Sequence, residues 1–289
     1  MTSPPALLIA GHGDPDASQT EAFRALVARA AARRPGVAVA GGGTGPGGGP
    51  SLAEAVDELA GRGVTRLTAV ALTLFPGGRG TAELTEAVAT ELADAGRRHP
   101  GLSGVLGRPL GPHPKVLDAL EERVAEAAGG GSRTPGDRAA TTVLLVGEGG
   151  TDPAGNAELC RAARLLWEGR GFAGVEPAFV SLAAPDVASG LDRCARLGAR
   201  RVVVLPYALF EGVATGRARQ QAEGWALAYP SVEVRFARPV GPVEALAEAV
   251  WDHYAEVAAR HDGYGDHRAA PCETHRRDEE RAKDHAHVR

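Results

Sequence analysis

The sequence predicts an α/β protein made of two tandem domains, each with a parallel sheet, that are related by internal duplication. Three observations support this fold class. Short apolar runs alternate with helical patterns, blocks of the first half recur in the second, and a glycine-rich linker separates the halves. Alternating strands and helices are typical of parallel sheets with helices on both faces. A chain of 289 residues with 44% hydrophobic residues is sufficient for two cores.

The duplication is visible as four blocks that keep their order at an offset of about 135 residues. The clearest block is GVTRLTAVALTLFPGG at 63–78, which matches GARRVVVLPYALFEGV at 198–213. The other three pairs are 51–63 with 186–198, 107–112 with 237–242, and Gly-His-Gly at 11–13 with Gly-Glu-Gly at 147–149. We therefore expect the same secondary structure in both halves.

In the first half, continuous apolar runs predict strands that are buried on both faces. They occur at 6–10, 37–40, 67–74 and 103–106. Between them, apolar residues three to four apart predict helices at 18–34, 51–63, 81–98 and 114–128. Ser18 and Ser51 are the expected N-caps, and Glu54 stands at the capping-box position after Ser51.

The second half repeats this order. Its predicted strands lie near 143–147, 175–181, 201–208 and 232–236, and its helices near 155–169, 186–197, 215–228 and 242–259. The expected organisation is an N-terminal half at 1–128, a Gly/Ser/Pro-rich linker at 129–140, a C-terminal half at 141–259 and a polar tail at 260–289.

Charge and cysteine content narrow the class of partner and the compartment. A net charge of −4 argues against a nucleic acid or an anionic membrane held by bulk charge. The three cysteines form no CxxC motif, and the chain shows neither a signal peptide nor a span of about 18–20 apolar residues. We expect a cytoplasmic protein with reduced thiols.

Most histidines lie outside any recognisable ligand spacing. The tail holds five of the nine, and its composition fits either solvated disorder or a segment that gathers metal. His99 and His113 flank helices and are expected to be structural or surface groups, and His253 on the last helix is expected at the surface.

Ligands of open parallel sheets bind at the carboxyl ends of the strands. His12 follows the first strand of the first half, and Glu148 takes the equivalent position in the second. Gly11 and Gly13 allow positive φ and close backbone approach beside His12. A histidine that only bonds its own loop is the alternative. The glycine stretch at 41–49 lacks the features of a phosphate loop and is expected to be a flexible insertion.

The order of these motifs resembles a known family. LLIAGHG, PSLAEAVDELAGRGV, LFPGG and RHPG…GRPLGPHP are similar to the class II sirohydrochlorin chelatases of the CbiX type, in the long, fused two-half form, over residues 6 to about 255. The resemblance implies a chelatase-like pair of flavodoxin-type domains. It also implies ATP-independent insertion of cobalt, or of iron or nickel, into sirohydrochlorin for cobalamin or sirohaem biosynthesis. The divalent metal would be a substrate, and no organic cofactor is expected.

The family's site residues carry over only in part. Its first histidine falls on His12, the expected catalytic base and metal ligand. Arg79 stands where the family has a second histidine, and the glutamate after the second strand has no counterpart in AGGGTGPGGGPSL. In the second half, Ser181 and Ala214 occupy the corresponding positions. Glu148 is the expected second metal ligand, with a solvated loop carboxylate as the alternative.

The substrate-binding residues expected from the resemblance are Gly11, Gly13, Gly77, Gly78 and Arg79. Arginine cannot coordinate a metal, but its guanidinium can bind a substrate carboxylate. An exposed charge at a helix start is the alternative for Arg79. Because a fused duplicate supplies both walls of a cleft, a monomer is sufficient and a dimer is possible. A chelatase-fold protein that lacks catalysis, and that binds metal or tetrapyrrole or partners an active paralogue, remains the alternative function.

Overall fold

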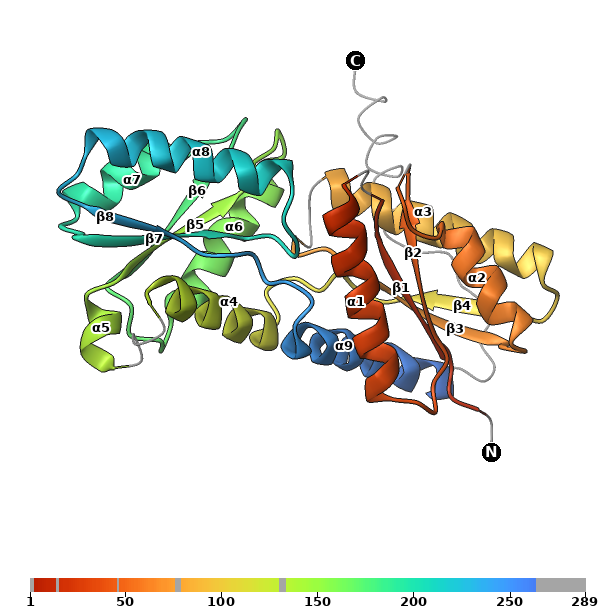
Figure 1. Cartoon of the computed structure of the whole chain (residues 1–289). Coiled ribbons are helices and arrows are strands. Elements are labelled where there is room, and N and C mark those ends of the chain that lie inside the picture. The colour runs from red at the N-terminus through yellow and green to blue at the C-terminus, as the bar shows by residue number, and fades with distance from the viewer. Residues whose placement is uncertain (1–2, 14–15, 46, 76–78, 130–133, 264–289) are drawn as a thin grey trace, which may run out of the picture.

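A computed structural model describes residues 3–13, 16–45, 47–75, 79–129 and 134–263. Two four-stranded parallel sheets with the orders β2-β1-β3-β4 and β6-β5-β7-β8 form its framework (Figure 1). The predicted α/β class with two duplicated halves is confirmed. Most of the predicted tail lies outside the described residues, so its disorder and its metal binding stay predictions. In the described part of the chain, no helix is both long enough and apolar enough to cross a membrane.

The first sheet and its helices follow the predicted order. The strands are β1 (Ala6–His12), β2 (Val39–Thr44), β3 (Arg66–Ala71) and β4 (Ser103–Leu106), and the helices are α1 (Ala17–Arg33), α2 (Leu52–Gly61), α3 (Arg79–Arg98) and α4 (Pro114–Ala127).

The second sheet repeats the arrangement. Its strands are β5 (Thr142–Gly147), β6 (Gly174–Phe179), β7 (Arg201–Pro206) and β8 (Glu233–Phe236), and its helices are α6 (Pro153–Trp167), α7 (Val187–Arg196), α8 (Val213–Ala228) and α9 (Glu244–Gly263). A short helix, α5 (Pro135–Ala139), lies inside the segment predicted as a linker.

The N-termini of the helices show which capping residues could be predicted from the sequence. Ser51 caps α2, and Glu54 completes the predicted capping box. The prediction for α1 was wrong by two residues, because Asp16 is the N-cap and its carboxylate accepts a hydrogen bond from the backbone N–H of Ser18 at 2.8 Å. Asp152 caps α6 in the same way, so the two halves share this start.

The glycine stretch after residue 40 is not a flexible insertion, because its first part belongs to β2. A Cβ on Gly41 would lie 2.4 Å from the side chain of Val27, and one on Gly42 would lie 2.7 Å from the carbonyl oxygen of Ser51. Distances under about 3 Å leave no room for a side chain. The glycines therefore let α1 and the start of α2 approach the strand from its two faces.

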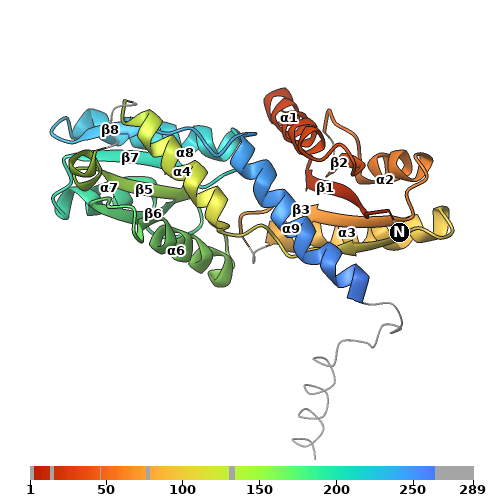
Figure 2. The ribbon, with the colours of Figure 1, turned by 90° about the horizontal axis from the view of Figure 1, so that it is seen from below.

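The last helix of each half covers the sheet of the other half. Helix α4 packs on β7 and α6, whereas α9 packs on α1 and β3 (Figure 2). One continuous cluster of buried apolar side chains runs from β1 and α1 through α4 and α9 to β5 and α6. The expected domain boundaries at 128 and 141 stay predictions. The sheet of each half is partly covered by a helix from the other half.

Hydrogen bonds and ion pairs reinforce this exchange. On α9, the indole N–H of Trp251 donates to the carbonyl oxygen of Ala30 at 3.1 Å, and the hydroxyl of Tyr254 donates to that of Pro5 at 2.6 Å. On the other side, Arg170 pairs with Asp118 and Glu121 of α4. Each exchanged helix is thus attached to the half that it covers.

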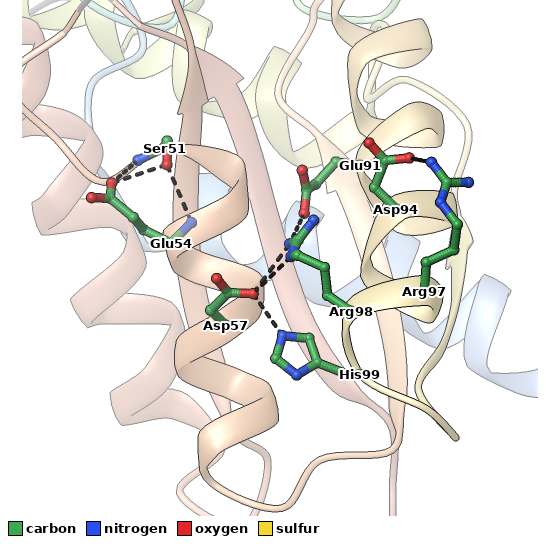
Figure 3. A network of polar contacts seen from close by, with 8 residues as sticks. All are labelled: Ser51, Glu54, Asp57, Glu91, Asp94, Arg97, Arg98 and His99. Carbon is green, nitrogen blue, oxygen red and sulfur yellow. Dashed lines mark hydrogen bonds and ion pairs between the residues drawn. The ribbon is translucent and has the colours of Figure 1, made fainter.

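Polar contacts between α2 and α3 lie on the outer face of the first half. Arg98 pairs with both Asp57 and Glu91, and Nε2 of His99 lies 2.7 Å from Oδ1 of Asp57 (Figure 3). The hydrogen bonds from His99 and Arg98 lower the pKa of Asp57. These groups are partly exposed, so the network adds little to stability compared with the apolar core.

His253 is fully buried, so its predicted surface position was wrong. It lies on α9 where this helix meets the start of α4, and its ring centroid is 5.4 Å from that of His113. Neither ring nitrogen has a hydrogen-bond partner of good geometry in the described chain. Burial, with a smaller contribution from Arg108, lowers the pKa of His253 to about 4.

Replacing Trp251 should test the exchanged helix. Trp251 is 1% exposed and packs against Arg34, Tyr254 and α1. Trp251→Ala should lower the free energy of unfolding by about 3–5 kcal/mol in urea denaturation, because it leaves a cavity in the shared core. Leu227→Ala, at a side chain that is 87% exposed, should change it by less than about 0.5 kcal/mol. Equal small losses would contradict the shared core.

His253 should make stability depend on pH. The unfolded chain takes up a proton near pH 6.5 and the folded chain only near pH 4, so stability should fall as pH drops through this window. Between pH 7 and pH 5, the wild type should lose about 2 kcal/mol more than His253→Leu in urea unfolding. Parallel losses in the two proteins would show that the histidine is not held neutral.

Candidate functional site

The carboxyl ends of both sheets face one cavity of about 1010 Å³. Its walls come from the ends of β1, β5, β6 and β7, from the segment after β3, and from the first turns of α1, α3, α6 and α8. In the first sheet, β2 and β3 lie on opposite sides of β1, and in the second sheet β6 and β7 lie on opposite sides of β5. The strand order therefore reverses beside β1 and β5, and ligands of such sheets bind at this switch point. The volume is at the upper end of the ~300–1,000 Å³ typical of small-molecule sites.

His12 is the last residue of β1 and lies in register with Thr44 of β2. Its side chain is exposed and lines the cavity. A Cβ on Gly80 would lie only 3.7 Å from Nε2 of His12, so the imidazole reaches the first turn of α3. The hydrogen-bonded strand thus carries the imidazole directly to the cavity.

Glu148 follows β5 immediately and lines the same cavity from the second half. Its side chain is exposed. The structure therefore brings together the two predicted metal ligands, which are 136 positions apart in the chain. Their roles as ligand and base stay predictions.

The glycines beside these two residues serve close packing. A Cβ on Gly13 would lie 2.5 Å from the carbonyl oxygen of Thr44, and one on Gly149 would lie 2.0 Å from that of Ser181. A Cβ on Gly11 would lie only 3.0 Å from the ring of Phe23, which is a tight contact. Neither Gly11 nor Gly13 has a positive φ, so of the two possibilities that glycine allows, only the close approach applies at these positions. Gly149 does have a positive φ of 83°.

The other predicted substrate-binding residues lie where the description ends. Gly77 and Gly78 are outside the described residues. Arg79 is the first residue of α3, and its side chain is likewise outside the described part. Their contact with a substrate stays a prediction.

Carboxylates and helix starts determine the electrostatics of the cavity. The titratable groups in its described lining are His12, Glu83, Glu148, Asp152 and Tyr207, and no lysine or arginine is among the described lining residues. The first turns of α1, α3, α6 and α8 line the same space and bring the positive ends of their helix dipoles to it. At α6 the carboxylate of Asp152 already accepts from the N–H groups of Ala154 and Gly155, whereas α8 has no side-chain cap. Such a site attracts a cation through its side chains and an anion through its backbone.

A complete metal cage is not formed by the described residues. No group of three His, Cys, Asp or Glu side chains among them could hold a metal ion. His12 and Glu148 can supply an imidazole nitrogen and a carboxylate oxygen, both of which are suitable for divalent transition metals. An ion bound here would keep open coordination positions for a second molecule.

The floor of the cavity joins the two halves. The rings of Phe75 and Tyr207 meet edge to face with centroids 5.2 Å apart, and the Tyr207 hydroxyl donates to the carbonyl oxygen of Leu74 at 3.3 Å. Burial raises the pKa of Tyr207. The sequence contains no signal for this contact except that both rings follow central strands.

The loop that carries Glu148 is held by Ser181 and Asn156, through contacts that the sequence did not predict. The backbone N–H of Ser181 donates to the carbonyl oxygen of Glu148 at 3.0 Å. Asn156 in the first turns of α6 donates through Nδ2 to the carbonyl oxygen of Gly150 at 2.8 Å and accepts from its N–H at 3.0 Å. An asparagine inside a helix, where it is a poor helix former, was the available signal.

Comparison with known proteins supports the same family in sequence. A family model described as CbiX matches residues 6–127 and 142–257. The sirohydrochlorin cobaltochelatase of Priestia megaterium is 31% identical over 188 residues, which cover 65% of this chain and 59% of that protein. The sirohydrochlorin ferrochelatase of the same organism is 29% identical over 175 residues, 60% of this chain and 62% of that protein. The chain thus spans about 60% of the length of these relatives.

Solved structures show the same architecture. SirB from Bacillus subtilis, determined with Fe³⁺, superposes with a TM-score of 0.74 at 20% identity and covers 91% of this chain and 99% of that one. CbiX, the terminal enzyme of sirohaem biosynthesis in denitrifying bacteria, has a TM-score of 0.57 at 25% identity and covers 86% and 98%. The match to SirB establishes the chelatase-like fold. Because the CbiX model covers both halves and nearly all of the described chain, this protein belongs to the CbiX family.

Proposed function

We propose that this protein is a metal chelatase, a lyase that inserts a divalent ion into sirohydrochlorin without ATP for cobalamin or sirohaem biosynthesis. The observation that carries the proposal is that His12 and Glu148 line one cavity from equivalent positions of the two halves. Cobalt is the first metal to test, because the cobaltochelatase relative is more similar than the ferrochelatase relative. Iron and nickel are the alternatives. The metal is a substrate, and no organic cofactor is proposed.

The reaction must remove two pyrrole N–H protons as the ion enters the ring. In the proposal, the imidazole of His12 first binds the incoming ion through its free ring nitrogen, since imidazole is a suitable ligand for Co²⁺, Ni²⁺ and Fe²⁺. When the ion passes to the ring nitrogens of the substrate, the same lone pair becomes available and accepts one of the two pyrrole protons. The carboxylate of Glu148 holds the ion from the opposite side of the cavity or accepts the second proton. Each residue supplies a function that the other half lacks.

The peripheral carboxylates of a tetrapyrrole need donors in a site without a described cation. Backbone N–H groups at the start of α8, which has no side-chain cap, are the proposed donors. Gly11 and Gly13 leave the space beside His12 free of side chains, so that a flat ring can lie against the imidazole. Gly77, Gly78 and Arg79 are proposed to complete substrate binding.

A second function has one observation in its favour. The described residues form no three-ligand group, which favours a protein that binds metal or tetrapyrrole without catalysis, or that partners an active paralogue. The enzyme assay below separates the two. One chain supplies both walls of the cavity, so a monomer suffices for either function, and a dimer stays open. The cytoplasm is the proposed location.

Removal of the imidazole should abolish most of the activity. Purified protein, sirohydrochlorin and Co²⁺ are incubated anaerobically, and insertion is followed by the absorption spectrum. The wild type should exceed the spontaneous rate, and His12→Ala should lose about 10²–10⁴-fold in kcat/KM because it loses a ligand and a base. A wild-type rate equal to the spontaneous rate would refute the enzyme, and equal rates in the two proteins would refute the role of His12.

Neutralising Glu148 should separate a local role from a general charge effect. Glu148→Gln should lower kcat by about 10- to 100-fold, because a neutral amide neither accepts the proton nor attracts the ion. Glu83→Gln removes the same charge from the same cavity and serves as the matched control, for which we expect less than about threefold loss. Equal losses in the two variants would assign the effect to net charge.

A further inference from the structure

The two predicted ligands are attached to the fold in different ways. His12 is part of β1 itself, where it pairs in register with Thr44, and Gly13 continues the contact by donating to the carbonyl oxygen of Thr44. In contrast, β5 ends at Gly147, one residue before Glu148. The position of Glu148 therefore depends on contacts made by the loop that follows the strand.

Two of these contacts come from the neighbouring strand end. The carbonyl oxygen of Glu148 accepts from the N–H of Ser181 at 3.0 Å, and Gly149 passes so close to Ser181 that no side chain would fit. These contacts hold the loop on the side that faces β6. They leave the following residue, Gly150, without a strand partner.

Asn156 holds the other side of the loop. Its side-chain amide accepts from the N–H of Gly150 at 3.0 Å and donates to the carbonyl oxygen of Gly150 at 2.8 Å. Both polar groups of one residue are thus satisfied by a single rigid amide. Because α6 begins at Pro153 and is anchored in the shared core through Leu159, this amide connects the loop to a rigid element.

We propose that Asn156 is a positioning residue, whose clamp on Gly150 holds Glu148 in the geometry needed for metal insertion. The inference rests on the proposed function, since it assigns to Asn156 an effect that acts only through the Glu148 carboxylate. Asn156 and Gly150 both line the cavity beside Glu148. A loop that can shift by about 1 Å would lose much of the rate, because metal and proton transfer depend on such distances.

A double-mutant cycle tests the inference through kcat. Asn156→Ala should lower kcat about 5- to 10-fold and leave the KM for sirohydrochlorin within about twofold. Once Glu148→Gln is present, adding Asn156→Ala should cost less than about twofold, because the group that it positions has lost its function. Asn156→Asp keeps an acceptor for the N–H of Gly150 but not the donor to its carbonyl oxygen, and should fall between wild type and Asn156→Ala. Multiplying losses would overturn the proposal.

A matched variant and a second readout complete the test. Cys160→Ala changes an exposed residue of the same helix and should leave kcat within about twofold. Affinity for Co²⁺ alone is measured by its visible absorption, and it should weaken in Asn156→Ala only while Glu148 is present. Coupling in Co²⁺ affinity without insertion activity would sustain the positioning role and refute the chelatase. Insertion activity without coupling would support the chelatase and refute the positioning role. Absence of both insertion activity and Co²⁺ binding would refute both proposals.

Discussion

The apolar core that runs through both halves is the constraint on which the rest of the structure depends. Helices α4 and α9 each cover the sheet of the other half, so the halves cannot separate without exposing side chains such as Trp251 and Leu120. The edge-to-face contact of Phe75 with Tyr207 extends this attachment to the floor of the cavity. The carboxyl ends of the two sheets are therefore held opposite one another before any ligand binds. The cavity is thus preorganised by folding, so that ligand binding need not order it.

Within this frame, the duplicated halves keep the backbone and change the chemistry. Gly13 and Gly149 pass against the carbonyl oxygens of Thr44 and Ser181 with no room for a side chain in either half. The residue directly before each of these glycines lines the cavity, and it is His12 in the first half and Glu148 in the second. The two halves thus present an imidazole and a carboxylate at matched positions, and both groups are suitable ligands for a divalent transition metal.

The cavity combines two electrostatic features, which in the proposed function act on the metal ion and on the tetrapyrrole respectively. The described lining contains a histidine and carboxylates, which favour a divalent cation, whereas the helix starts around it bring the positive ends of helix dipoles, which favour an anion. The CbiX membership of the chain is consistent with this division.

The sequence by itself determined the α/β class, the duplication, nearly all helices and strands, and the family, because apolar periodicity, capping residues and repeated motifs act over short stretches of chain. The sequence also predicted that His12 and Glu148 lie at the carboxyl ends of strands, where parallel sheets bind ligands. Only the tertiary structure decided that α4 and α9 are exchanged, that His253 is buried, that the glycines at 41–43 belong to a strand and that Asn156 clamps the Glu148 loop. These features depend on contacts between residues that are far apart in the sequence, and local sequence patterns do not predict such contacts.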